Sequence, residues 1–136
     1  MSKQSRRGFI SKAGKVVAAT SLAGVSSLSF GQAPKNIFIH HVYFWLKNPS
    51  SKEDRAKLVE GLKNLSKVKT IDFSHIGQPA DTNRDVIDSS YAVSWLLFFK
   101  DKANQDSYQT DPIHLDFISK CSHLWEKVVV YDTVNL

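Results

Sequence analysis

The chain has 136 residues, a length that suits one domain, and a formal net charge of +5. All of the excess charge lies in residues 1–33. The other 103 residues carry 13 basic and 13 acidic side chains, which argues against a nucleic-acid-binding surface. The single cysteine, Cys121, excludes a disulfide within the chain, so packing alone must stabilise the domain.

Residues 1–33 have the features of a twin-arginine signal peptide. The stretch Ser5-Arg6-Arg7-Gly8-Phe9-Ile10 matches the export pattern, and a short apolar run follows from residue 13 to about residue 30. Lys15 interrupts this run, which falls short of the roughly 20 apolar residues that a membrane span needs. We therefore expect cleavage near Ala33, no stable membrane anchor, and a periplasmic domain of residues 34–136. The alternative is a disordered basic tail.

Residues 37–65 predict a strand followed by a helix. The stretch 37–46 is rich in aromatic and β-branched residues, as strands are, and Asn48-Pro49 ends it. Ser50 and Glu53 then have the spacing of a capping box. The apolar residues of the next segment recur with helical spacing up to about residue 65, so they predict one buried stripe: Leu58, Val59, Leu62 and Leu65.

The rest of the chain continues as two strands, two helical pieces and a closing strand. The expected ranges are 68–77 and 91–99 for the strands, 102–109 and 112–125 for the helices, and 127–134 for the last strand. Residues 78–90 are rich in Asp, Asn, Ser and Pro and predict a loop. The order β-α-β-β-α-β predicts an α+β ferredoxin-like fold, with a four-stranded antiparallel sheet covered by helices on one face.

The pattern of two strands also predicts a homodimer. Alternate residues of 37–46 point to opposite faces, and both sets are apolar or aromatic: His40, Val42, Phe44 and Leu46 on one face, and His41, Tyr43 and Trp45 on the other. In 91–99, Tyr91 shares a face with Val93 and Trp95. Because helices cover only one face, we expect a second copy to cover the other. The alternative is a monomer with an aromatic outer face.

Four stretches of the chain resemble the stress-responsive A/B barrel family, often called Dabb. They are 40–47 (His-His-Val-Tyr-Phe-Trp-Leu-Lys), 91–99, 108–114 (Tyr-Gln-Thr-Asp-Pro-Ile-His) and 124–132 (Leu-Trp-Glu-Lys-Val-Val-Val-Tyr-Asp). The resemblance covers essentially all of residues 34–136. It implies a dimeric α/β barrel built from two ferredoxin-like subunits, in agreement with the strand pattern. The family is functionally mixed.

The chain is also similar to plant olivetolic acid cyclase, a polyketide cyclase. In that enzyme a His and a Tyr, in a pocket between sheet and helices, promote an aldol-type ring closure. The resemblance implies that these two residues correspond to His114 and Tyr108, the family's strand-one histidine to His40, and its pocket Trp to Trp125. The family often has His before the motif proline, where this chain has Asp111.

The residue types support the same chemistry. His114 lies on the predicted helix 112–125 with Phe117, Cys121 and Trp125 at spacings of three and four residues, which is the inward stripe. A neutral imidazole held there is suited to act as a general base, and Tyr108 to donate a hydrogen bond to a carbonyl or enolate oxygen. The alternative is a core histidine whose ring bonds to a backbone carbonyl.

We expect a small apolar, aromatic or polyketide-like ligand in the space between sheet and helices. The residues expected to line it are His40, Phe44, Leu58, Val59, Leu62, Trp95, Phe117, Trp125 and Val128. The alternative is that these side chains fill the space as a core. His41 is expected in the dimer interior and His123 in solvent.

No metal site and no cofactor are expected. The five histidines lack the spacing His-x-x-x-His, there is no paired cysteine, and no glycine-rich phosphate loop is present. If the protein is an enzyme, we expect cyclase, lyase or isomerase chemistry through His114 and Tyr108. The alternatives are a non-catalytic ligand-binding or stress-response dimer and, by fold analogy alone, a cofactor-free monooxygenase.

Overall fold

The computed structural model describes residues 36–136, so the predicted signal peptide lies outside the described residues. The strands are β1 (Phe38–Leu46), β2 (Phe73–Gly77), β3 (Val93–Phe99) and β4 (Trp125–Val134). The helices are α1 (Lys52–Leu65), α2 (Lys102–Thr110), α3 (Pro112–Cys121) and the 3₁₀ turn η1 (Ser122–Leu124). The predicted ferredoxin-like α+β fold is confirmed.

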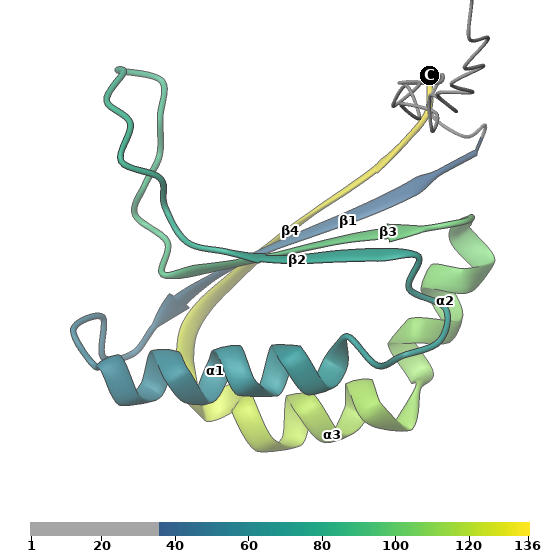
Figure 1. The fold of residues 1–136 in the computed structure, drawn as a ribbon, viewed down its shortest axis with the longest axis horizontal. Helices are drawn as coiled ribbons and strands as arrows, with labels where there is room; N and C mark the ends of the chain where they lie inside the picture. The colour runs from purple at the N-terminus through teal and green to yellow at the C-terminus, as the bar shows by residue number, and fades with distance from the viewer. Residues whose placement is uncertain (1–35) are drawn as a thin grey trace, which may run out of the picture. The chain divides into compact units, whose positions relative to one another are not determined.

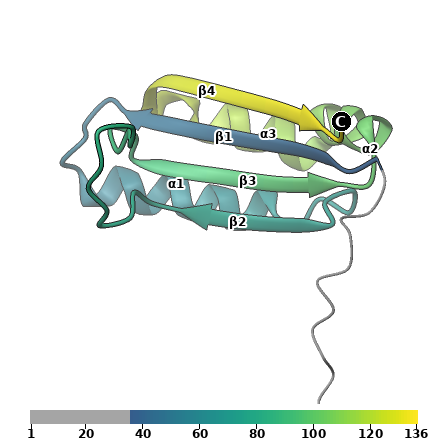
Figure 2. The ribbon, with the colours of Figure 1, turned by 90° about the horizontal axis from the view of Figure 1, so that it is seen from above.

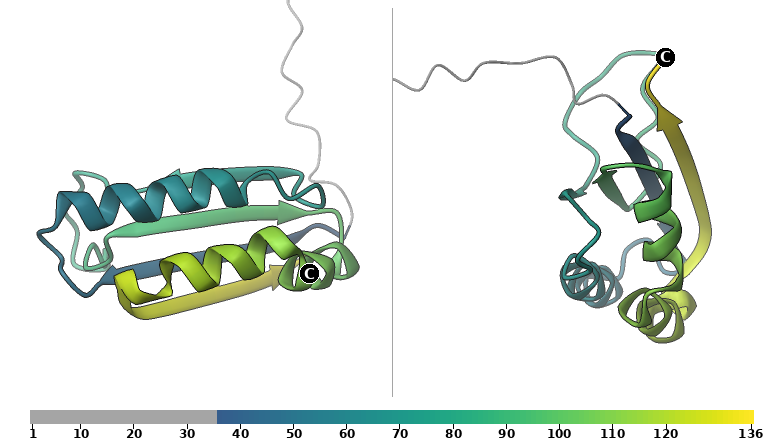
Figure 3. Two further views of the ribbon diagram at one scale, coloured as in Figure 1. Left: turned by 90° about the horizontal axis from the view of Figure 1, so that it is seen from below. Right: turned by 90° about the vertical axis from the view of Figure 1, so that its right-hand side faces the viewer.

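The four strands form one antiparallel sheet in the order β2-β3-β1-β4 (Figure 2). The helices all lie on one side of this sheet, while the segment between β2 and β3 rises on the opposite side (Figure 1). Seen from the helical side, α1 lies over β2 and β3, and α3 lies over β1 and β4 (Figure 3). We call the face under the helices the inner face and the opposite face the outer face.

Local sequence explains where the helices begin. The Ser51 hydroxyl accepts a hydrogen bond from the Asp54 N–H at the start of α1, and Asp101 does the same for α2 through the Asn104 N–H. Asp111 ends α2 and caps α3, whose first residue is Pro112. The expected helical ranges, 102–109 and 112–125, separate at this same point.

Three predicted boundaries were wrong, and one of them is the start of the third strand, which begins at Val93 rather than at residue 91. The second strand begins at Phe73 rather than at residue 68, because tight backbone turns follow α1 and bury Val68 in the core. The last helix ends at Cys121, and Trp125 begins β4 instead of closing that helix. Trp125 pairs with Leu46, and the Lys47 N–H donates to the Leu124 carbonyl, so pairing with β1 overrides the helical spacing.

The core lies between the inner face and the helices. The burial of alternate β1 residues follows the predicted alternation, with Phe38, His40, Val42, Phe44 and Leu46 buried on the inner face. Tyr91 was assigned to the inner face, and this was wrong. It lies just before β3, and its ring contacts the outer-face residues Tyr43 and Trp45. In the described part of the chain, no helix is long and apolar enough to cross a membrane.

Helices α1 and α3 approach each other closely at Gly61. A methyl group at this position would lie 2.6 Å from the Cys121 sulfur and 3.1 Å from the Phe117 ring. Glycine is normally a poor residue inside a helix, by about 1 kcal/mol relative to alanine. Here the missing side chain allows the helices to pack together.

We predict that Gly61→Ala destabilises the protein, because steric overlap costing about 1–3 kcal/mol outweighs the gain in helix propensity. In a Cys121→Ala background the closest contact is removed, and the same substitution should be neutral or stabilising. Urea unfolding of the four proteins measures both effects. An equal loss of unfolding free energy in the two backgrounds would contradict the packing argument.

Candidate functional site

A cavity of about 200 Å³ lies between the inner face and the helices. Residues of β1, β3 and β4 line it on the sheet side, and residues of α1, α2 and α3 line it on the helical side. Its lining residues are His40, Val42, Phe44, Leu65, Trp95, Tyr108, Gln109, His114, Phe117, Ile118, Trp125, Val128 and Val130. Most of this wall is apolar. The polar side chains that approach it include two imidazoles and one phenol, and their hydrogen bonds decide what the cavity can do.

The His114 ring is oriented by the break between α2 and α3. Its Nδ1 atom lies 3.1 Å from the Gln109 carbonyl oxygen. A carbonyl only accepts hydrogen bonds, so Nδ1 carries the hydrogen and the lone pair of the neutral ring is at Nε2. Burial lowers the pKa of His114 more than the Gln109 contact raises it, which favours this neutral form.

The Gln109 carbonyl is available because the helix breaks at Asp111, whose backbone is extended before Pro112. In a continuous helix this oxygen would accept from the Ile113 N–H, four residues ahead. Here the Ile113 N–H donates instead to the Asp111 carboxylate at 2.8 Å. Pro112 has no N–H of its own, and the Asp111 N–H donates to the Tyr108 carbonyl. The freed Gln109 oxygen then receives the His114 hydrogen bond.

Tyr108 is the most deeply buried polar side chain of the site, with 1% of its surface exposed. The Trp95 indole N–H donates to its phenol oxygen at 3.3 Å, which leaves the phenol hydrogen available to another acceptor. Burial raises the pKa of Tyr108, so the group stays a neutral donor. Its ring centroid lies 4.6 Å from that of His114 and 5.9 Å from that of His40.

His40 enters the site from β1 with a carboxylate behind it. It is paired in register with Asp132 on β4, and His40 Nδ1 lies 2.6 Å from Asp132 Oδ1. His40 is nearly buried, whereas the Asp132 side chain is 46% exposed. A carboxylate that holds Nδ1 orients the ring and leaves Nε2 as the nitrogen available to a ligand.

Three aromatic rings form the apolar end of the cavity. The Trp125 ring centroid lies 5.0 Å from that of Phe44 and 5.8 Å from that of Phe117. On the β4 side, Val128 and Val130 are each 44% exposed, so the cavity opens to solvent along this edge of the sheet. The arrangement offers polar groups at one end and apolar surface at the other.

The structure brings together most, but not all, of the predicted site residues. Those that line the cavity are His40, Phe44, Trp95, Tyr108, His114, Phe117, Trp125 and Val128. Leu58 and Leu62 do not line it, contrary to the prediction, because both are fully buried in the core. Val59 also fails to reach it and borders a separate depression beside Arg55 and Ile76.

Several residues of the site were not predicted. Val42 and Val130 have inner-face positions that strand alternation makes recognisable, and Ile118 follows His114 by one helical turn. Leu65 was predicted only as part of the α1 stripe. Gln109 and Asp132 could not be predicted from any local sequence pattern. The Gln109 carbonyl contacts His114 because the helix breaks after it, and Asp132 contacts His40 through the pairing of β4 with β1.

The remaining histidines lie apart from the cavity. His41 is on the outer face, where its Nδ1 lies 3.0 Å from the Tyr43 hydroxyl, and His75 is on β2. His123 is exposed, as predicted. Within residues 36–136, no group of three or more His, Cys, Asp or Glu side chains is placed to hold a metal ion.

Comparison with known proteins gives a family match. The family model of the Stress responsive A/B Barrel Domain, Dabb, matches residues 38–135. No curated protein matches the chain.

Solved structures share the fold at low sequence identity. A Dabb family protein with a ferredoxin-like fold from Mesorhizobium loti is 23% identical, with a TM-score of 0.62 over 75% of this chain and 99% of that one. Hydroxynitrile lyase from Passiflora edulis is 20% identical, with a TM-score of 0.63 over 76% and 96%. A dimeric ferredoxin-like protein of unknown function from Bacteroides fragilis is 16% identical, with a TM-score of 0.58 over 76% and 100%. Two other similar structures are also described as dimeric.

Proposed function

The chain belongs to the stress-responsive A/B barrel family, and from that premise we propose that it binds a small apolar, aromatic or polyketide-like carbonyl compound and transfers a proton at carbon. The proposed site is the cavity between the sheet and the helices. The observation that supports it best is the hydrogen-bonding state of His114. Its Nδ1 hydrogen is committed to the Gln109 carbonyl, so its Nε2 lone pair is free to act as a base.

The proposed reaction needs two groups. His114 removes a proton from the carbon next to a carbonyl, and Tyr108 donates a hydrogen bond to the oxygen on which negative charge develops. Tyr108 is suited to this because Trp95 already occupies one lone pair of the phenol oxygen. His40, oriented by Asp132, is proposed to position the carbonyl compound. The similarity to a hydroxynitrile lyase favours lyase-type reactions among those that this pair could perform.

A second candidate function is ligand binding without catalysis. The cavity volume of about 200 Å³ is below the range of about 300–1,000 Å³ that ligand pockets usually have. In addition, the Tyr108 and His114 rings pack on each other. A site of this size favours a ligand with a single ring, and it leaves little room for a large substrate to reorganise.

Hydrogen–deuterium exchange distinguishes the two candidates. We predict that the protein accelerates exchange of the α-hydrogens of small aryl ketones in D₂O, measured by ¹H NMR. His114→Gln should slow this exchange at least ~100-fold, the usual size of a general-base contribution. The rate should fall in acid, because protonation of His114 removes the base. Since the pKa of His114 is lowered, the midpoint of this fall should lie below the ordinary histidine value of 6.5.

The exposed His123 provides a matched control, and His123→Gln should exchange at the wild-type rate. An unchanged rate in His114→Gln would exclude the proposed base. Ketone binding without exchange in the wild-type protein would favour the ligand-binding function instead.

We also propose that the protein is a homodimer whose two outer faces pack together. Similar structures are described as dimeric. The outer face carries aromatic side chains that the helices do not cover, among them Phe73 at 51% exposure and Tyr131 at 61%. A second copy would remove this surface from water.

The proposed dimer should weaken in acid. The pKa of His41 is lowered by burial, and then by the nearby charges of His75 and His40, so the packed face favours the neutral ring. His75, Tyr43 and Tyr131 are the other titratable groups beside it. A second copy would bury His41 further and lower its pKa again, so protonation of this ring as the pH falls below its ordinary value of 6.5 opposes dimerisation.

We therefore predict that the dissociation constant of the dimer rises at least ~10-fold between pH 7.5 and pH 5, as measured by sedimentation velocity. In His41→Gln this dependence should be reduced, whereas His123→Gln should keep it. A dissociation constant that does not change with pH in the wild-type protein would contradict the assignment to His41.

Finally, we propose export to the periplasm through the twin-arginine pathway, on the basis of residues 5–10. Replacing both Arg6 and Arg7 by lysine keeps the charge but removes the pattern. The protein should then stay in the cytoplasmic fraction, as detected by immunoblotting. Periplasmic protein at the wild-type level in this variant would exclude the pathway.

A further inference from the structure

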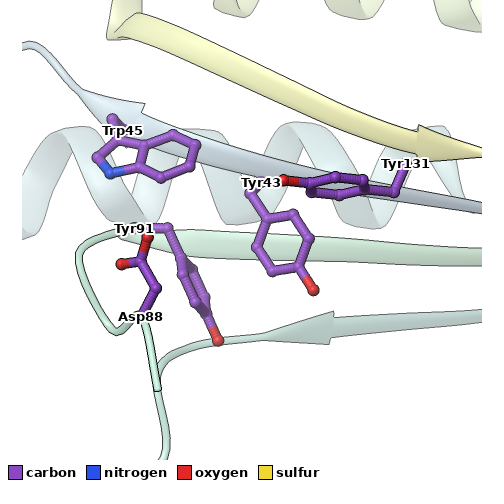
Figure 4. A pocket seen from close by; sticks show the side chains of 5 residues that line it. All are labelled: Tyr43, Trp45, Asp88, Tyr91 and Tyr131. Carbon is purple, nitrogen blue, oxygen red and sulfur yellow. The ribbon is translucent and has the colours of Figure 1, made fainter. Parts of the chain in front are cut away.

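The outer face contains a second cavity, of about 280 Å³, at the end of the sheet where the segment between β2 and β3 returns to β3. Five residues line it: Tyr43, Trp45, Asp88, Tyr91 and Tyr131 (Figure 4). We call this cavity the aromatic hollow. It lies on the opposite side of the sheet from His114 and Tyr108, and neither of them contributes to it.

The rings of the aromatic hollow stand nearly perpendicular to their neighbours. The Tyr43 and Tyr91 rings are 4.9 Å apart at 73°, and the Tyr43 and Tyr131 rings are 6.0 Å apart at 78°. The Trp45 and Tyr91 rings are 6.5 Å apart at 77°. Rings in this arrangement form adjacent walls of the hollow rather than a stack.

Hydrogen bonds hold this wall in place. The Trp45 indole N–H donates to the Ser90 hydroxyl at 3.0 Å, and the Ser90 N–H donates to the Asp88 carboxylate at 2.9 Å. The side chain and then the backbone of Ser90 lower the pKa of Asp88, so this group is a carboxylate at neutral pH. On the other side, the Tyr43 hydroxyl is hydrogen-bonded to His41 Nδ1 at 3.0 Å.

A cation already lies against one of the walls. The Lys127 ammonium is 4.3 Å from the centroid of the Trp45 ring, which is cation–π distance. Its charge also lowers the pKa of Asp88, as the last of several causes, so it is close enough to act on the carboxylate. The aromatic faces and the carboxylate therefore make this end of the outer face attractive to positive charge.

We propose that the aromatic hollow binds a small organic cation of the alkylated or quaternary ammonium class. Such ions are weakly hydrated and apolar on their outside, which suits walls made of four aromatic rings and one carboxylate. A metal ion would need several oxygen ligands, and the hollow offers one carboxylate. This proposal does not depend on the carbonyl chemistry proposed above. In the proposed dimer, the hollow of each copy faces the space between the two sheets.

Choline and its neutral isostere 3,3-dimethylbutan-1-ol provide the test, because they have nearly the same shape and differ in charge. Binding is followed by the indole N–H signals in ¹H–¹⁵N NMR spectra of the purified protein. We expect choline to shift the Trp45 signal and to bind on the order of tenfold more tightly than the alcohol. The Trp95 and Trp125 signals, from the inner face, should move little and serve as internal references.

Three variants locate the site. Asp88→Asn should weaken choline binding several-fold by removing the carboxylate charge, and Lys127→Met should strengthen it several-fold by removing a competing cation. A gain of binding cannot result from misfolding. His123→Gln alters an exposed side chain that lines neither cavity, and this variant should bind choline as the wild-type protein does.

Sedimentation of the same samples reports the oligomeric state, so failure of the dimer proposal and failure of this one can be distinguished. Equal binding of choline and the alcohol would overturn the proposal, as would weaker choline binding in Lys127→Met. Dimeric protein that binds no choline would overturn it too, and would indicate that side chains of the second copy fill the aromatic hollow.

Discussion

The position of β1 between β3 and β4 is the constraint on which the rest of the structure depends. A strand alternates its side chains between two faces, so a single register decides which residues meet the helices and which do not. In the observed register His40 lies on the inner face opposite Asp132, and His41 lies on the outer face. A slip of one residue would exchange these two histidines and place the aromatic side chains of Tyr43 and Trp45 in the core.

The two faces of this sheet use polar groups differently. On the inner face Tyr108 and His40 are buried, and burial in apolar surroundings is tolerable only because Trp95 and Asp132 hydrogen-bond to them. These bonds also fix which atoms remain available. On the outer face of the single chain Asp88 is exposed, and its carboxylate charge acts beside the rings of the aromatic hollow. Burial therefore controls proton affinity on one side, and exposed charge controls ion preference on the other.

The element order, the faces of β1 and the inward position of His114 could be predicted from the sequence, because each follows from local periodicity. Trp125 could not be placed, since its spacing suits a helix and only pairing with Leu46 makes it a strand residue. Asp132 meets His40 through a register that spans 92 residues. Leu58 and Leu62 belong to the right stripe of α1, but periodicity cannot tell a side chain that fills a core from one that borders a cavity.

The cap at Asp111 has a consequence for how such proteins diverge. By taking the Ile113 N–H, this carboxylate releases the Gln109 carbonyl, and that oxygen determines which nitrogen of His114 holds the hydrogen. The extended backbone of Asp111 before Pro112 keeps this carbonyl out of the helical hydrogen-bond pattern, so the break between α2 and α3 fixes the tautomer of an imidazole three positions away. Selection acting on this one break could move the basic lone pair of His114 from one ring nitrogen to the other, toward or away from a ligand, while the ligand's binding surface is inherited intact.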